Sequence, residues 1–368
     1  MYPDLSAQIL SELRRPRGYP AVSVLVPTHR REPENAQDPV RLRNLLAEAK
    51  DLVQADPAVS RADRIAVLDQ LDQAASQIDP VDLAYAGDGL ALFAAPGEHH
   101  VWSLGRTVPA RVVLAETFVT RNLVAAQLAD QPYWVLAVAA DHASLWSGGP
   151  ERVVEQDTGG FPLTRDLEDP DAERKERIGD LPSTFRDEQT RQFLRDVDTA
   201  VTSVLRADPR PLYVLGEAAA VAVLEEVGTA AGRATAVVRH GGLAQGSAEA
   251  VREAVLPAVK EQAEKESASV QQELDQARGR RQFAAGIDEV WQQVTAGRVG
   301  LLAVEEPYLV TVRDDGDHLV PAEPGDRGAR DDIVDEIIEK ALDTGARVSF
   351  LPDGALAGTG HISAALRY

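Results

Sequence analysis

The chain has 368 residues, of which 44% are apolar and none is cysteine, and its formal net charge is −21. This length exceeds what one hydrophobic core usually organises, so we expect two or three domains. The absence of cysteine excludes disulfides, thiolate metal sites and cysteine nucleophiles. The negative charge argues against a general nucleic-acid coat, DNA included, because phosphate binding needs concentrated lysine and arginine.

The sequence contains no segment that reads as a membrane anchor. No apolar run approaches the roughly 20 residues that a membrane-spanning helix needs. The N-terminus also lacks the apolar core of a signal peptide. We therefore expect a soluble, cytoplasmic protein that does not contact membranes.

Residues 1–130 have the pattern of a mixed α/β domain. Helical periodicity alternates with short β-branched runs and tight turns. The predicted elements are a helix at 6–15, a strand at 21–26, helices at 39–54 and 60–78, strands at 90–95, 101–104 and 111–114, and a helix near 118–128.

Residues 131–246 predict a second α/β domain in which antiparallel strands are followed by a strand–helix–strand succession. The predicted elements are strands at 133–139, 143–146 and 152–155, a helix at 186–205, a strand at 211–215, a helix at 218–230 and a strand at 235–238. A long polar loop, residues 158–182, interrupts this pattern. Loops of this length are usually functional or disordered.

Residues 247–282 are highly charged and helical, with a break or kink expected at Pro257. They bridge to a third α/β domain, residues 283–368. Its predicted elements are a helix at 283–296, strands at 299–304 and 308–312, a polar excursion at 314–330, and then a helix and two strands. In the terminal helix, Asp331 and Asp332 place carboxylates at the positive end, and Gly345 ends the helix.

The first of two candidate sites is the polar segment that follows the first strand. Thr28, His29, Arg30 and Arg31 follow the first strand directly, where ligand contacts are common. A solvated loop that caps the next helix is an equally good interpretation of this segment. His99 and His100 are a poor metal pair, because adjacent residues of a strand point to opposite faces, and the other histidines are isolated in the sequence. No nucleophile motif is present, and no metal or cofactor site is indicated.

Four stretches resemble the bacterial branch of the archaeo-eukaryotic peptide-chain release factor family, which also includes Pelota and Balon-type hibernation factors. These stretches are residues 19–30, 87–105, 211–227 and the terminal GALAGTGHISAALRY. The resemblance implies three domains: an N-terminal domain that faces the ribosomal decoding region, an RNase H-like middle domain, and a C-terminal domain similar to the ribosomal protein L7Ae. It also implies the ribosome as partner, through rRNA, with tRNA and a translational GTPase as further candidates.

The chain departs from this family at one motif. Release factors carry Gly-Gly-Gln in the middle-domain loop, whereas the corresponding loop here contains Gly159, Gly160 and Phe161. Phenylalanine has no amide with which to position water, so we predict no catalytic residue. The same loop carries Arg174, Lys175 and Arg177 as candidate contacts to RNA phosphates, although acidic residues surround them.

Three hypotheses follow for the function. The first is a non-catalytic factor that occupies the ribosomal A site in rescue or hibernation. The second is a divergent peptidyl-tRNA hydrolase that uses another group of the same loop. The third, which the acidic charge favours, is a stress-related protein-interaction module that has lost its RNA surface.

Overall fold

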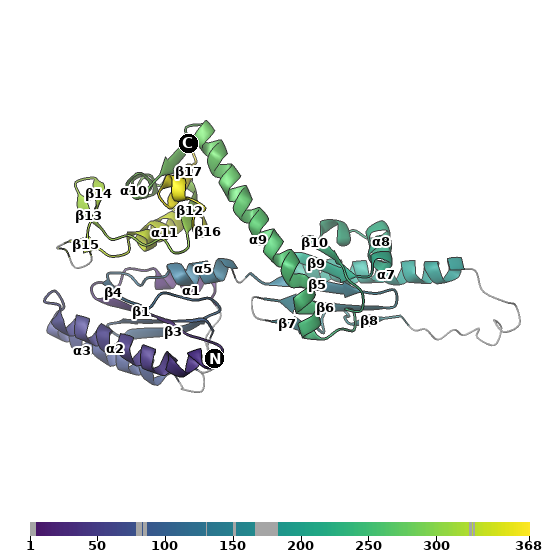
Figure 1. The fold of residues 1–368 in the computed structure, drawn as a ribbon, viewed down its shortest axis with the longest axis horizontal. Helices are drawn as coiled ribbons and strands as arrows, with labels where there is room; N and C mark the ends of the chain where they lie inside the picture. The colour runs from purple at the N-terminus through teal and green to yellow at the C-terminus, as the bar shows by residue number, and fades with distance from the viewer. Residues whose placement is uncertain are drawn as a thin grey trace, which may run out of the picture. The chain divides into compact units, whose positions relative to one another are not determined.

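The computed structural model describes residues 5–78, 83, 87–129, 131–149, 152–165, 183–323, 326 and 328–368. These residues form sheets covered by helices, which confirms the mixed α/β fold class (Figure 1). The chain divides into two compact units. The first unit is Met1–Ala129 together with Ser269–Tyr368, and the second is Asp130–Ala268.

The N-terminal part of the first unit is an antiparallel sheet in the order β3-β2-β1-β4. Its strands are β1 (Ala21–Pro27), β2 (Gly89–Ala95), β3 (Glu98–Leu104) and β4 (Arg111–Ala115). Its helices are α1 (Ala7–Leu13), η1 (Glu34–Gln37), α2 (Asp38–Ala55), α3 (Arg61–Ser76) and α5 (Arg121–Ala129). The predicted helix near 118–128 therefore begins later, at Arg121.

Strand β1 is buried on both faces because helices cover both sides of its sheet (Figure 1). Alternate side chains of a strand point to opposite faces. Val22, Val24 and Val26 accordingly pack against α2 and α3, whereas Ala21 and Leu25 pack against α1 and α5. This explains why all side chains of Ala21–Val26 are apolar except Ser23, whose buried hydroxyl accepts from the Val119 N–H at 2.9 Å.

The second unit is a mixed sheet in the order β10-β9-β5-β6-β7, with β8 paired to β6. Strands β5, β6 and β7 are antiparallel, and β9 and β10 run parallel to β5. The strands are β5 (Tyr133–Val138), β6 (His142–Gly148), β7 (Val153–Glu155), β8 (Leu163–Thr164), β9 (Leu212–Gly216) and β10 (Ala236–Arg239). Helices α7 (Ser183–Ala207) and α8 (Ala218–Val227) cover one face, and η2 (Ala231–Arg233) follows α8.

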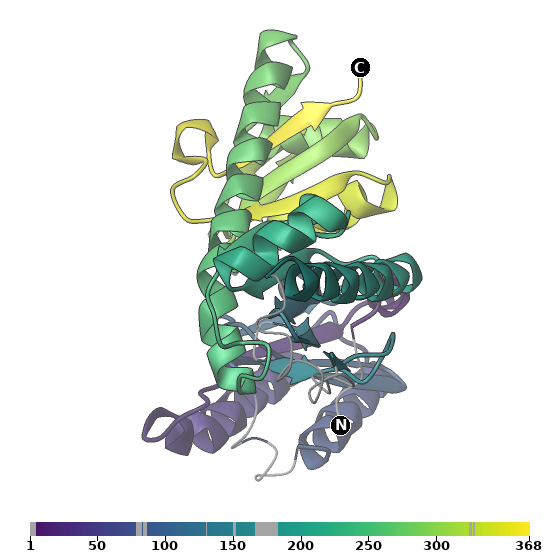
Figure 2. The same ribbon diagram turned by 90° about the vertical axis from the view of Figure 1, so that its right-hand side faces the viewer.

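Helix α9 (Ala248–Gly279) is one continuous helix, so the break expected at Pro257 is wrong (Figure 1). Proline removes one intrahelical donor, but apolar packing on either side of it holds the helix together. Val255 and Ala258 are buried against the sheet of the second unit. The last turns of α9, in the first unit, run across the C-terminal sheet, where Leu274 packs on Leu301 (Figure 2).

The C-terminal sheet has the order β11-β17-β12-β16. Its strands are β11 (Phe283–Ala285), β12 (Val299–Glu305), β16 (Arg347–Leu351) and β17 (Ile362–Leu366); its helices are α10 (Ile287–Thr295), α11 (Ile333–Asp343) and η3 (Ala357–Thr359). The helix predicted at 283–296 is wrong at its start, since residues 283–285 pair with β17. Helices α10 and α11 cover the face opposite α9.

A small sheet in the order β14-β13-β15 replaces the predicted strand at 308–312 and much of the polar excursion that follows. Its strands are β13 (Val312–Asp315), β14 (His318–Pro321) and β15 (Ala329–Arg330). Val312 and Leu319 are buried in the adjoining core. One buried apolar side chain from each of β13 and β14 anchors this hairpin, although most of its other side chains are polar.

The predicted terminal element is confirmed. The Asp332 side chain caps α11 by accepting from the backbone N–H of Asp335. Gly345, just beyond the helix, has a φ of 72°, a backbone conformation that glycine adopts at little cost. Strand β17 then lies between β11 and β12 inside the sheet, so the end of the chain is held by pairing on both sides.

Candidate functional site

The residues that follow β1 form an ordered polar edge on the N-terminal sheet. Thr28 is buried, with 2% of its surface exposed, and its hydroxyl donates to the Gly87 carbonyl at 2.7 Å. Its N–H donates to the Asp88 carbonyl at 3.3 Å. Thr28 therefore fixes the start of the segment and is not available to a ligand.

His29 is held by a buried carboxylate. The oxygens of Asp38, the first residue of α2, accept from the His29 backbone N–H at 2.7 Å and lie 2.9 Å from the ring Nδ1. The Arg41 guanidinium, one turn along the helix, pairs with the same carboxylate. Asp38 is 1% exposed, while the His29 side chain is 38% exposed. The imidazole is therefore oriented by Asp38 and presents its other edge to solvent.

Arg30 and Arg31 supply exposed cationic groups beside this histidine. Arg30 Nε donates to Asp88 at 2.8 Å and its Nη2 donates to the Gly105 carbonyl at 3.2 Å. This guanidinium is therefore tethered to the turns at the ends of β2 and β3. The sequence interpretation named His29 and Arg30 but not Asp38 and Asp88, which position them.

In the second unit, Gly159, Gly160 and Phe161 form a tight turn that is anchored in the core. Both glycines have positive φ values, 63° and 88°, and the Phe161 N–H donates to the Thr158 carbonyl at 3.1 Å. A Cβ on Gly159 would lie 2.5 Å from Cγ2 of Val204 on α7. Only glycine fits this contact, because both the backbone conformation and the space exclude a side chain.

The Phe161 side chain is buried, with 1% of its surface exposed, in the core between the sheet and α7. The chain then pairs with β6 through β8, where Thr164 is opposite His142. Arg165 continues this attachment by donating to the hydroxyl of Thr190 at 2.9 Å. The phenyl ring thus fixes the base of the polar loop and is not on its surface. The candidate residues Arg174, Lys175 and Arg177 lie outside the described residues.

The described part of the chain contains no group of three or more histidine, aspartate or glutamate side chains that could hold a metal ion. Across the same residues, no helix is long and apolar enough to cross a membrane.

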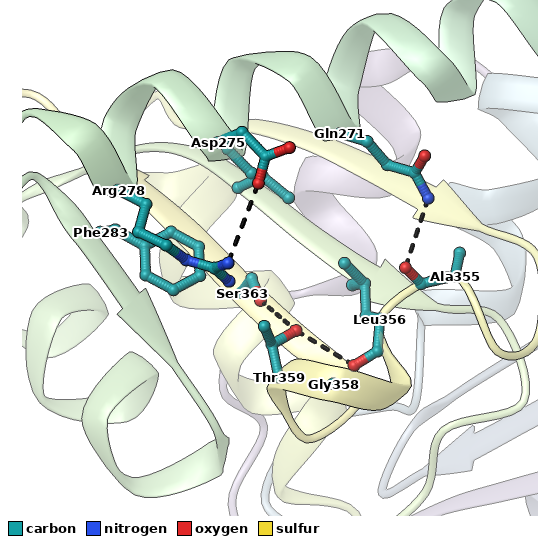
Figure 3. A pocket seen from close by; sticks show the side chains of 10 residues that line it. Gln271, Asp275, Arg278, Phe283, Ala355, Leu356, Gly358, Thr359 and Ser363 are labelled. Atoms are coloured by element: carbon teal, nitrogen blue, oxygen red, sulfur yellow. Dashed lines mark hydrogen bonds and ion pairs between the residues drawn. The ribbon is translucent and has the colours of Figure 1, made fainter.

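A cavity of about 230 Å³ lies between the last turns of α9 and the η3 turn (Figure 3). Its polar groups are paired with one another. The Thr359 hydroxyl donates to the Leu356 carbonyl at 3.0 Å and accepts from Ser363 at 2.8 Å. The Arg278 guanidinium lies 4.5 Å from the centre of the Phe283 ring, which walls the cavity. We assign this cavity to packing between α9 and the sheet.

Comparison with protein families gives one match. Residues 132–298 match the model of bacterial archaeo-eukaryotic release factor family 3. The matched segment contains the sheet of the second unit, the turn at Gly159 and the whole of α9. A comparison with curated proteins gives no match.

Solved structures with similar chains include an archaeal translation termination factor, aRF1, at 18% identity, covering 98% of this chain and 97% of that one with a TM-score of 0.26. A model of ribosome-bound archaeal Pelota and ABCE1 matches at 16% identity, covering 74% and 73% with a TM-score of 0.43. Dom34 of S. cerevisiae, a translation termination-like factor that interacts with Hbs1, matches at 11% identity, covering 79% and 82% with a TM-score of 0.40.

Proposed function

We propose that the chain, whose residues 132–298 match the model of bacterial archaeo-eukaryotic release factor family 3, is a ribosome-associated translation factor that does not hydrolyse peptidyl-tRNA. It occupies the ribosomal A site and acts there by occupancy, in rescue of stalled ribosomes or in hibernation. We propose rRNA as the main contact, with tRNA and a translational GTPase as further candidate partners.

The observation that carries the absence of hydrolysis is the environment of Phe161. A release factor needs a side-chain amide at the tip of this loop to position the attacking water. Here the third residue of the motif is an apolar ring that is 1% exposed in the core. The loop of residues 158–182 contains no glutamine at any position. The turn at Gly159 and Gly160 therefore supports the fold of the loop base and provides no group for ester hydrolysis.

The polar edge after β1 supports ribosome binding. A histidine oriented by a buried carboxylate and two exposed arginines lie on consecutive residues, His29 to Arg31. The guanidinium group of arginine can donate two parallel hydrogen bonds to phosphate oxygens. An imidazole can form a hydrogen bond with an exposed base or stack on it. Because the segment is already fixed by Asp38 and Asp88, little conformational freedom is lost on binding. We propose this edge as the contact to RNA in the decoding region.

The cationic residues of the loop, Arg174, Lys175 and Arg177, are proposed as a second contact to RNA. The described anchor at Phe161, β8 and Arg165 holds the start of this loop at the sheet of the second unit. A loop held at a defined position can carry a small number of phosphate contacts even on an acidic protein, since the local charge decides binding at short range.

Sedimentation of cell extracts tests ribosome association. The chain, detected by immunoblot, is expected in the ribosome fractions of a sucrose gradient, with more of it there in stationary-phase cells than in growing cells. An Arg30→Gln, Arg31→Gln variant tests the N-terminal edge, because both positions are exposed, and its thermal unfolding is compared with that of the wild type, since Arg30 also bonds to Asp88 and Gly105. A protein that stays at the top of the gradient under all growth and salt conditions contradicts the proposal.

A further inference from the structure

Within the first unit, the N-terminal residues contact the C-terminal residues through ion pairs of a single polarity. In the described part of the chain, arginine always lies on the N-terminal side and an acid on the C-terminal side. The pairs are Arg14 with Asp343 at 3.8 Å, Arg106 with Glu306 at 2.6 Å, and Arg111 and Arg121 with Asp332 at 2.8 and 3.5 Å. We name the four arginines the arginine face.

Two members of the arginine face are enclosed by the C-terminal residues. Arg121 is 4% exposed, and its guanidinium donates to the carbonyls of Tyr308 and Glu306, both at 2.6 Å. Arg111 donates to the carbonyl of Asp331 at 2.9 Å in addition to its ion pair with Asp332. Carboxylate and carbonyl oxygens thus surround these guanidinium groups on the C-terminal side.

The other two arginines of the arginine face, Arg14 and Arg106, each have one N–H group without a hydrogen-bond acceptor. The Nε–H groups of Arg14 and Arg106 are buried and have no hydrogen-bond acceptor. Asp343 lies too far from Arg14 Nε for a hydrogen bond, at 3.8 Å. Glu306 approaches only the Nη2 of Arg106. A binding partner that presents more oxygen atoms than these carboxylates would satisfy both arginines better.

We propose that the arginine face is an RNA-binding surface, and that the acidic C-terminal residues cover it in the free protein as an autoinhibitory contact. Glu306, Asp332 and Asp343 occupy the positions that phosphate groups would take, and RNA must displace them to bind. This explains how a chain with a net charge of −21 can both carry an RNA surface and avoid nonspecific binding to nucleic acid.

The nature of the four side chains favours a phosphate polymer as the occupant. All four are arginine and none is lysine, and the planar guanidinium binds phosphate through two parallel hydrogen bonds. Arg14 follows α1, Arg106 lies in the turn after β3, and Arg111 and Arg121 begin β4 and α5, so the arginine face is assembled from four separate elements. The choice of RNA over another polyanion rests on the proposed function, whereas the autoinhibitory contact does not.

The test compares the full chain with an opened variant, Glu306→Gln, Asp332→Asn and Asp343→Asn. Asparagine is also a good N-cap, so Asp332→Asn retains the start of α11. A charge-matched control carries Asp315→Asn, Asp317→Asn and Asp353→Asn, three exposed acids that make none of these contacts. Binding of a short fluorescein-labelled single-stranded RNA is measured by anisotropy over a series of salt concentrations.

The opened variant is expected to bind this RNA more tightly than the wild type and the control. Its affinity should also depend more steeply on salt, by about 0.7 in the log–log slope for each arginine that gains a phosphate. Adding Arg106→Gln and Arg111→Gln to the opened variant should remove the gain. An affinity no higher than that of the control overturns the proposal, as does a gain that survives removal of the arginines. Competition by polyglutamate as strong as by RNA overturns the choice of RNA.

A second measurement does not depend on the folding of that variant. The chain has no cysteine, so Arg106→Cys with Glu306→Cys introduces a unique pair across the contact, where the two native side chains lie 2.6 Å apart and are 21% and 45% exposed. Joining this pair with a short bis-maleimide should abolish RNA binding, and the same variant without crosslinker should retain it. Equal binding before and after crosslinking contradicts autoinhibition. Ribosome sedimentation of the unlinked protein separately reports on the proposed function.

Discussion

The backbone N–H of Arg121 donates to Oδ1 of Asp335 at 2.7 Å, although the two residues are 214 positions apart in the chain. This bond joins the start of α5 to α11 within the first unit. Glu339, one turn further along α11, accepts from the Thr120 hydroxyl at 3.4 Å. Two carboxyl groups on adjacent turns are therefore buried against the N-terminal residues, at 3% and 7% exposure.

Burial raises the pKa of Asp335 to about 8, and the nearby charge of Asp332 adds to the effect. The Arg121 N–H and guanidinium oppose it, and Glu336 raises it slightly. Burial likewise raises the pKa of Glu339 to about 10, with Asp335 and Glu336 adding to it and Arg14 and Thr120 opposing it. Both groups therefore hold a proton in the folded protein at pH values where they would lose it in the unfolded chain.

The first prediction follows from this difference. A carboxyl whose pKa is raised by folding contributes stability that is complete below its unfolded pKa and is lost as the pH rises through the folded value. The free energy of unfolding should thus fall as the pH rises above about 4.5, up to about pH 8 for Asp335 and up to about pH 10 for Glu339, by at most about 1.4 kcal/mol per pH unit from each carboxyl. Urea unfolding at a series of pH values measures this slope.

Glu339→Gln provides the control for the pH prediction. The amide has nearly the shape of the protonated acid and cannot ionise, so the variant should lose about half of the slope below pH 8 and nearly all of it between pH 8 and pH 10. Glu261→Gln changes an exposed acid on α9 and should leave the slope as in the wild type. A wild-type stability that is constant or rises over this range would show that both carboxyls are ionised in the folded chain.

The second prediction concerns Phe161. Replacing it with glutamine restores the sequence Gly-Gly-Gln but removes a buried ring and places an amide in an apolar core. Phe161→Gln should cost about 3 kcal/mol in the free energy of unfolding and should not produce peptide release. Phe161→Leu, which keeps an apolar side chain, is the matched control and should cost less. Efficient peptidyl-tRNA hydrolysis by Phe161→Gln would show that the residue reaches the loop tip.

The third prediction concerns Gly159. An alanine there would combine a φ of 63° with a Cβ 2.5 Å from the Val204 side chain. Gly159→Ala should lower the free energy of unfolding by about 2 kcal/mol, because the strained backbone conformation and the steric clash with Val204 both destabilise the folded state. Gly149→Ala is the control, since a Cβ at that position meets no atom within 4 Å. Similar thermal unfolding of the two variants would contradict the described turn.

Much of the fold could be predicted from local sequence. The strand β1 followed from its β-branched residues, and the ends of α11 followed from Asp332 and Gly345. These signals are local, because capping and turn residues act within a few positions. The strand at 283–285 was missed because three residues show no period, and only pairing with β17 defines them.

For the candidate site, too, local sequence identified some residues, whereas the contacts that position them depend on the fold. His29, Arg30 and Arg31 could be named because they follow a strand, but the carboxylate that orients His29 belongs to α2. The burial of Phe161 depends on α7, which begins beyond the polar loop. The arginine face could not be predicted from the sequence, because its ion pairs join residues that are about 200 or more positions apart. Contacts of this kind are decided by topology.

The fourth prediction concerns Asp38. Asp38→Asn weakens the pairing with Arg41, and it leaves one acceptor oxygen where the carboxylate uses two, one for the His29 backbone N–H and one for the ring Nδ1. We expect a loss of about 2 kcal/mol in stability and weaker ribosome binding. Asp51→Asn, at an exposed position of the same helix, is the control. Unchanged ribosome binding in Asp38→Asn would remove His29 from the proposed RNA contact.

The most direct test of the central claim is sedimentation of the purified chain with stalled ribosomes that carry a labelled peptidyl-tRNA in the P site. We predict that the chain moves into the ribosome fractions while the labelled peptide remains on the tRNA. A chain that stays at the top of the gradient would contradict ribosome binding. Labelled peptide released in proportion to the chain would contradict the assignment of a factor that acts without hydrolysis.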